Sequence, residues 1–196
     1  LDSLPDERRY LLERFRLEDV ALRVGGVGSV GTRCMIVLLE GGAGDDALLL
    51  QLKEAGPSVL EAHLERKVSL GPAQRVVTGQ RLMQAASDIF LGWHQSAWTN
   101  HEFYWRQLKD MKGSADVSAM EEDGFKTYVA LCSWCLARAH ARTGDAAAIR
   151  GYIGRNDSLA KAIADFAVAY ADQTERDYEA LVAAVESGRL TAETGI

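Results

Sequence analysis

Apolar residues recur along the chain with a period that changes from helix-like to strand-like and back again. Near the N-terminus an apolar stripe predicts a short helix within residues 1–18; its members are Tyr10, Leu11, Leu12 and Phe15. Ser3, which is followed by Pro5 and Asp6, is the expected start of this helix, and the helix is expected to end near Arg16.

The middle of the chain, residues 19–112, has the alternation of a sheet. Two helices interrupt the strands: a short one over residues 59–67 with Ser58 as its cap, and a longer one over residues 73–87. We therefore expect a small antiparallel sheet of about five strands with one or two helices. The strands are predicted over residues 20–24, 32–39, 47–53, 89–93 and 101–108.

Residues 113–196 are rich in alanine and have a helical period throughout. An apolar stripe from Phe125 to Ala139 predicts a helix over residues 125–142 that ends at Gly144. A long second helix is predicted to begin at Asn156-Asp157-Ser158 and to continue to Val185. The fold class is therefore α+β, with an N-terminal helix, a small sheet and an all-helical C-terminal part.

Composition restricts the partners and the compartment. The chain has 196 residues and a net charge of −6, which argues against a broad basic surface for nucleic acid or for an anionic membrane. No apolar run is long enough to span a bilayer, and the first residues lack the apolar core of a signal peptide. A cytoplasmic location is expected. Because the chain begins at Leu1 rather than at methionine, we expect a fragment or a processed product.

The cysteines and histidines give no pattern typical of a metal site. Cys132 and Cys135 form a C-x-x-C inside a helical apolar pattern, so both are expected to be buried in helix packing. With Cys34 they make an odd set of three, which suits a reducing compartment. The four histidines lack metal-ligand spacing. We therefore assign no residue to a metal or to catalysis.

One G-x-G-x-x-G, made by Gly26, Gly28 and Gly31 and including Ser29, follows the first predicted strand. In a dinucleotide-binding fold such glycines open a helix, whereas in the small lobe of a kinase they form the tip of a β-hairpin over nucleotide phosphates. The residues after Gly31 make a poor helix and a good strand, and no Gly-Lys-Ser/Thr of a P-loop follows. The sequence therefore favours the hairpin.

Lys53 lies where a kinase-type site places its phosphate-binding lysine. It ends the apolar run of residues 48–52, so a phosphate or a carboxylate should neutralise it if the sheet buries it. Glu61 is the first candidate for that carboxylate. Glu54, Glu65 and Asp88 are alternatives that spacing does not separate. A simpler interpretation is also open, in which the glycines form an ordinary turn and the lysine is a solvated residue at the end of a strand.

Several blocks of sequence resemble one bacterial family. Residues 27–34, 50–55, 79–84, 106–114 and 136–142 are similar, in order, to the C-terminal half of domain of unknown function 2252. The resemblance implies a distant relationship to aminoglycoside phosphotransferases and other kinases. It places a catalytic loop and metal ligands in an upstream half that this chain lacks, so ATP would bind here with Mg²⁺ held by residues outside the chain.

The same resemblance makes the segment from Gln107 to Lys109 a hinge whose backbone would bind adenine. The chain departs from the kinase pattern at Arg33, where a small apolar residue usually covers the base. The leading hypothesis is a nucleotide-binding part of a phosphotransferase-like protein. Its partner would be the upstream half, and the fragment alone would be inactive. The alternative is a non-enzymatic kinase-like scaffold that binds a partner. A third hypothesis, an NAD-dependent oxidoreductase, requires a helix immediately after Gly31.

Overall fold

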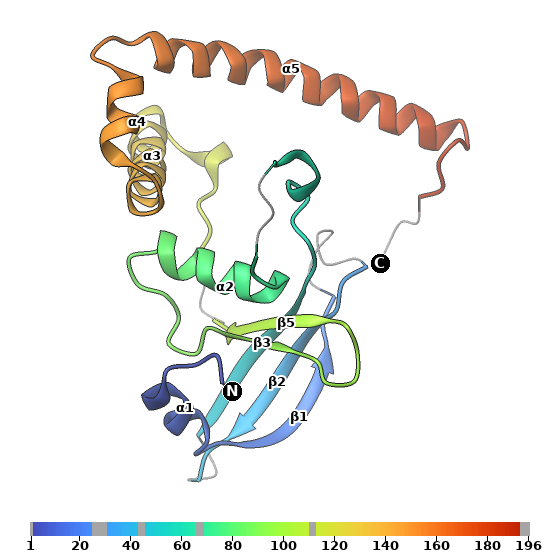
Figure 1. The fold of residues 1–196 in the computed structure, drawn as a ribbon. Helices are drawn as coiled ribbons and strands as arrows, with labels where there is room; N and C mark the ends of the chain where they lie inside the picture. The colour runs from blue at the N-terminus through green and yellow to red at the C-terminus, as the bar shows by residue number, and fades with distance from the viewer. Residues whose placement is uncertain (1, 25–30, 43–45, 66–68, 110–112, 193–196) are drawn as a thin grey trace. The chain divides into compact units, whose positions relative to one another are not determined.

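Figure 1 shows a computed structural model that describes residues 2–24, 31–42, 46–65, 69–109 and 113–192. Within these ranges the sheet strands are β1 (Arg16–Leu22), β2 (Cys34–Glu40), β3 (Ala47–Ala55), β4 (Gly92–Gln95) and β5 (Glu102–Gln107). The helices are α1 (Asp6–Leu12), α2 (Pro72–Met83), α3 (Glu122–Thr143), α4 (Ala146–Ile153) and α5 (Ser158–Glu186), with 3₁₀ turns at Glu61–His63 and Val117–Ala119. The predicted α+β class, with its helices mostly in the C-terminal part, is confirmed.

The five strands form one sheet in the order β1-β2-β3-β5-β4, and every neighbouring pair is antiparallel. β1, β2 and β3 form consecutive hairpins, whereas α2 separates β3 from β4 in the chain. β5 lies between β3 and β4 in the sheet, so its residues pair with β3 on one side and with β4 on the other. Lys53 of β3 faces Cys34 of β2 on one side and Tyr104 of β5 on the other.

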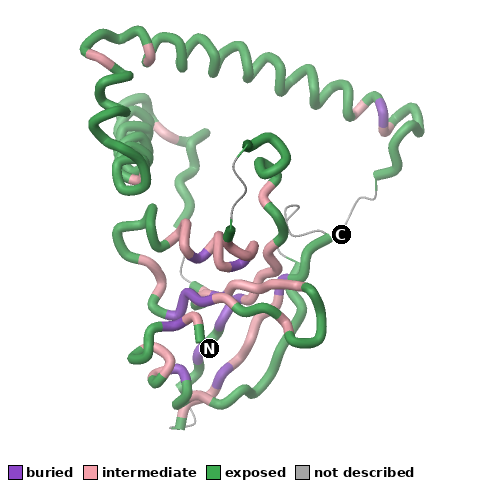
Figure 2. The backbone as a smooth tube through the Cα atoms, in the orientation of Figure 1, coloured by how far each residue is buried: buried purple, intermediate pink, exposed green. Residues whose placement is uncertain are grey.

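Side chains of successive strand residues point to opposite faces, which gives the sheet an apolar face and a mixed face. The apolar face, called here the α1 face, includes Leu50, Leu52 and Trp105 and is partly covered by α1. Figure 2 shows buried stretches of the backbone, in purple, in the sheet and in the N-terminal region. The hydrophobic core consists of Leu4, Leu12, Leu39, Leu48, Leu50, Phe90 and Trp105.

The opposite face, called here the α2 face, carries helix α2, which contacts β3, β4 and β5. Ala73 and Val77 are the buried residues of this helix. Glu102 of β5 fixes the first turn of the helix, because its Oε2 accepts a hydrogen bond from Ala73 N at 2.9 Å. A carboxylate at this position also satisfies a free amide at the positive end of the helix.

The N-terminal segment differs in detail from the prediction. α1 begins at Asp6, after Pro5, and ends at Leu12 rather than near Arg16, where β1 already begins. Ser3 does not cap the helix. Its Oγ donates to Trp93 O (2.7 Å) and accepts from Trp93 N (2.8 Å), so it joins the N-terminal segment to β4.

Several predicted elements are shorter in the structure. The helix predicted over residues 73–87, for example, ends at Met83. The helix expected over residues 59–67 is a single 3₁₀ turn, Glu61–His63, in the described part of that range. Ser58 is not the cap of this turn, because Leu60 occupies the N-cap position and no side chain caps it; Ser58 Oγ accepts from Leu60 N at 3.3 Å just before the turn begins. Val59 is 86% exposed, so no packed apolar face extends the turn into a helix. Before β4, Asp88 Oδ1 accepts from Phe90 N (2.8 Å), and the resulting turn shortens the predicted strand of residues 89–93.

The chain divides into two compact units, Leu1–Thr143 and Gly144–Ile196. The predicted change from sheet to helix at residue 113 falls between β5 and α3. α3 nevertheless lies in the first compact unit, together with the sheet. Arg142 Nε of α3 donates to Leu82 O of α2 at 2.9 Å. The second unit contains α4, which was not predicted, and the long predicted helix α5. Figure 2 shows most of α3, α4 and α5 as exposed.

Candidate functional site

The glycine-rich segment connects two antiparallel strands. β1 and β2 stay paired up to the segment, where Arg23 N donates to Cys34 O at 2.8 Å. Gly31 has a φ of +81°, a left-handed conformation that glycine adopts without strain. The other predicted loop residues, Gly26, Gly28 and Ser29, lie outside the described residues. Because a strand follows Gly31, the helix that an NAD-dependent oxidoreductase requires is absent from residues 31–42, and that hypothesis is excluded.

Lys53 lies at the end of β3 that adjoins this hairpin. It is half-buried. Leu52 lines the α1 face, so the side chain of Lys53 emerges on the α2 face. Among the described residues, no hydrogen bond or ion pair to its ammonium is formed. The structure therefore brings the predicted cation to the hairpin without giving it a carboxylate there.

The candidate carboxylates are held elsewhere. Glu61 accepts from Ser58 N (2.9 Å), and its Oε1 lies 3.8 Å from Arg75 Nε of α2. The structure therefore does not bring Glu61 to Lys53. Asp88 is used in the turn before β4, and Glu65 is exposed. α2 itself contains no Asp or Glu.

Glu54, the remaining alternative, belongs to a polar network on the other face of the sheet. Its Oε2 accepts from Arg33 N (3.1 Å) and from Arg33 Nη1 (2.9 Å), and its Oε1 lies 3.0 Å from His101 Nδ1. Burial raises the pKa of Glu54. The hydrogen bonds and the charge of Arg33, with a smaller effect of His101, outweigh burial and leave the pKa below its usual value. This network joins the start of β2, the end of β3 and the segment before β5.

The network also decides the direction of Arg33, which the sequence left open. Arg33 follows the glycine segment at the position where kinases usually have a small apolar residue. In this structure its guanidinium binds Glu54, one residue after Lys53 on β3, and the two side chains of successive strand residues lie on opposite faces. Arg33 therefore does not lie beside Lys53.

Three further residues surround Lys53 on the α2 face. Cys34 and Gln51 are buried, and Gln51 Nε2 lies 3.7 Å from Cys34 Sγ. Burial raises the pKa of Tyr104, an effect that the charge of Arg106 opposes and that Cys34 reinforces. The sequence contained a signal for this polar group, since Gln51 and Lys53 alternate with leucines in an otherwise apolar strand.

The predicted hinge residues Gln107 and Lys109 line a polar cavity of about 360 Å³ between the end of β5 and the segment after α2. Leu108 N donates to Leu49 O at 2.8 Å. Because the backbone groups of successive residues in an antiparallel strand point to opposite sides, those of Gln107 and Lys109 point away from β3. The side chains of both predicted residues are exposed. Gln84, Asp88 and Arg106 line the same cavity.

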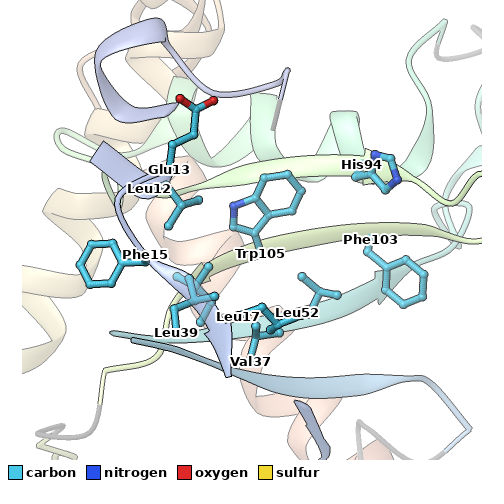
Figure 3. Close-up of a pocket in the computed structure, with 11 residues that line it drawn as sticks. Leu12, Glu13, Phe15, Leu17, Val37, Leu39, Leu52, His94, Phe103 and Trp105 are labelled. Atoms are coloured by element: carbon cyan, nitrogen blue, oxygen red, sulfur yellow. The ribbon is translucent and has the colours of Figure 1, made fainter. Parts of the chain in front are cut away.

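A larger, apolar pocket of about 440 Å³ lies on the α1 face, between α1 and the sheet (Figure 3). Phe15, Leu17 and Leu52 line it, and Trp105 forms part of its wall. Glu13 and His94 are its ionisable lining residues. No pattern in the sequence had indicated this pocket.

The remaining candidate groups are the histidines, cysteines and carboxylates that could ligate a metal ion. Among the described residues, no group of three or more His, Cys, Asp or Glu side chains could hold a metal ion. Cys132 and Cys135 are exposed on α3, so the prediction that both are buried in helix packing is wrong. None of the helices in the described ranges combines the length and the apolar character that a membrane crossing requires.

Comparison with known proteins identifies a family without an assigned activity. The family model described as "Uncharacterized protein conserved in bacteria (DUF2252)" matches residues 1–184. No curated protein and no solved structure gives a match.

Proposed function

The chain belongs to the bacterial family DUF2252, and we propose that its α2 face binds the phosphates of a nucleotide in the manner of a kinase small lobe. The observation that carries this proposal is the position of Lys53, a half-buried cation that has no anionic partner among the described residues. A lysine whose side chain is partly covered by the sheet and has no anion beside it is a candidate phosphate ligand.

The order of the parts supports the same proposal. A glycine-rich connection joins β1 to β2, a lysine lies on β3, and a helix follows before β4 and β5. In protein kinases the glycine loop covers the phosphates and the lysine is on β3. Lys53 pairs with Cys34, which is three residues after Gly31 along the chain. The lysine is therefore close to the end of the glycine-rich connection, as a kinase-type site would require.

The adenine would be bound near the end of β5. The backbone groups of Gln107 and Lys109 are the candidates for this contact, because Leu108 N is already used by Leu49 O. The nucleotide is ATP in this proposal, and residues outside this chain would hold Mg²⁺. Lys53, as an unpaired cation, fits a phosphate group.

The proposal is limited to binding. Phosphoryl transfer also needs a positioned base and metal ligands, and active kinases pair their β3 lysine with a glutamate on the following helix. α2 contains no carboxylate, and Glu61 is close to Arg75 instead. These two observations favour a second candidate function, a kinase-like scaffold that binds a protein partner and no nucleotide.

Isothermal titration of the chain with Mg-ATP distinguishes the two functions. Removing a charged hydrogen bond to phosphate costs about 1.5–3 kcal/mol, so Lys53→Ala should weaken binding about 10- to 100-fold. Lys126→Ala is the matched control. Lys126 is an exposed lysine of α3 that pairs with Glu122, and its removal should leave the affinity unchanged.

Equal affinities of the native chain and Lys53→Ala would refute the role of this lysine. If neither this chain, shown to be folded, nor a longer protein that supplies the Mg²⁺ ligands gives binding heat, the scaffold function is supported instead. Circular dichroism of each variant separates loss of binding from loss of folding.

A further inference from the structure

The pocket on the α1 face contains one feature that an ordinary apolar core lacks. The indole Nε1 of Trp105 is buried and has no hydrogen-bond partner. Trp105 is only 5% exposed and lines the pocket. Buried indole N–H groups usually find an acceptor, since leaving the donor unpaired away from water is unfavourable.

The packing around Trp105 holds this donor in place. The ring lies so close to Gly92 that a Cβ there would come within 2.7 Å of Trp105 Cε2. Figure 3 shows the indole nitrogen turned toward Leu12 and Phe15, the α1 side of the pocket, and away from His94. The donor is therefore directed to one known side of the cavity.

From this geometry we infer that the pocket binds an uncharged apolar molecule with one hydrogen-bond acceptor, such as a carbonyl, which takes the Trp105 N–H. The walls favour an apolar body, because the lining is mostly leucine, valine and aromatic side chains. Among the described lining residues there is no Lys or Arg that could neutralise an anionic ligand, which favours an uncharged one.

Size sets a further limit on the ligand. The cavity measures about 440 Å³. An apolar cavity of roughly 150 Å³ holds one benzene ring, so two fused rings with a short substituent fit well. The pocket is on the face opposite Lys53, and the inference is independent of the nucleotide proposal.

The ligand's acceptor reaches the indole N–H only if a lining side chain moves, because the nitrogen itself is covered. α1 is the part of the wall that can yield. It has seven residues, too few to be stable as an isolated helix, and Leu12 is its buried residue. Binding should therefore displace Leu12 slightly and leave the sheet in place.

Equilibrium dialysis with two probes of nearly equal shape tests the inference. 2-Acetylnaphthalene has a carbonyl acceptor, whereas 2-ethylnaphthalene has none. Native protein should bind the ketone about 5-fold more tightly, the gain of one hydrogen bond. Trp105→Phe keeps an aromatic ring and removes the donor, so the preference for the ketone should disappear, because its carbonyl would be buried without a partner. Trp98→Phe removes an indole that is 94% exposed and should behave like native protein.

A second variant keeps the test decisive if Trp105→Phe does not fold. Leu17 is 59% exposed on β1 and lines the pocket, so Leu17→Trp should fill the pocket and weaken both probes to a similar extent. The inference is overturned if native protein binds neither probe saturably or shows no preference for the ketone. It is equally overturned if the preference survives in Trp105→Phe, or if Leu17→Trp binds as native protein does.

Discussion

Replacing Gly92 by alanine is expected to destabilise the sheet-containing unit. An added Cβ would lie 2.7 Å from Cε2 of Trp105 and 3.1 Å from Cδ2 of Leu4. Trp105 is buried in the core and cannot swing into solvent. Since β4 pairs Gly92 directly with Trp105, the backbone at Gly92 cannot retreat without disturbing the strand.

The magnitude follows from two opposing effects. Overpacking a core costs about 1–3 kcal/mol. Replacing glycine also lowers the entropy of the unfolded chain, which returns about 0.4–1 kcal/mol. We expect a net loss of about 1–2 kcal/mol. The matched control is Gly79→Ala in α2, where a Cβ would meet nothing within 4 Å. Glycine inside a helix costs about 0.5–1 kcal/mol relative to alanine, so this control should stabilise the protein.

Urea unfolding followed by far-UV circular dichroism measures both variants. The midpoint should fall for Gly92→Ala and rise for Gly79→Ala, with little change in slope. Combining Gly92→Ala with Trp105→Phe should cost less than the sum of the two single changes, because the smaller ring leaves room for the new methyl group. A Gly92→Ala protein as stable as the native one, or strict additivity in the double variant, would refute this account of the contact.

Four further substitutions test the structure in other places. Ser3→Ala should lower the free energy of unfolding by about 1–3 kcal/mol, because both backbone groups of Trp93 lose their partner; an unchanged urea midpoint would contradict this. Asp145→Ala should weaken α4 by about 0.5–2 kcal/mol, seen as faster amide exchange over residues 146–153. Asp157→Ala should leave α5 unchanged, since the side chain of Asp157 forms no cap. The folded-state pKa of Glu54 is depressed, so its stabilisation is present at neutral pH and is lost as the pH falls through that pKa. The stability difference between native protein and Glu54→Gln should therefore shrink in acid, and a difference that grows in acid in the same urea titrations would contradict the network.

Much of the sheet could be predicted from the sequence because its signal is local. Residues 32–39 and 47–53 are short apolar runs bounded by glycine-rich turns, the first rich in β-branched residues and the second in leucine, and they form β2 and β3. The glycines between β1 and β2 likewise indicated a hairpin rather than a strand-helix turn. α4 was missed although Asp145 followed by three alanines is a helix start, because Gly144 was interpreted only as the end of the preceding helix.

The contacts of the site could not be predicted, because they depend on register between strands. Arg33 meets Glu54 only because β2 and β3 pair in one particular alignment, and His101 joins them from a segment 47 residues further along (101 − 54 = 47). The unpaired donor of Trp105 has the same origin. Its surroundings come from α1, β4 and the sheet, and no spacing along the chain reveals them.

The most direct test of nucleotide binding is the reactivity of individual lysines. Native protein is labelled with an amine-specific reagent with and without Mg-ATP, and the rate at each lysine is measured by peptide mass spectrometry. The proposal predicts that the nucleotide slows the labelling of Lys53 several-fold. It predicts no change at Lys126 and Lys161, which are exposed and lie on helices. Equal labelling of Lys53 in both conditions, at nucleotide concentrations that saturate the protein, would contradict the proposal.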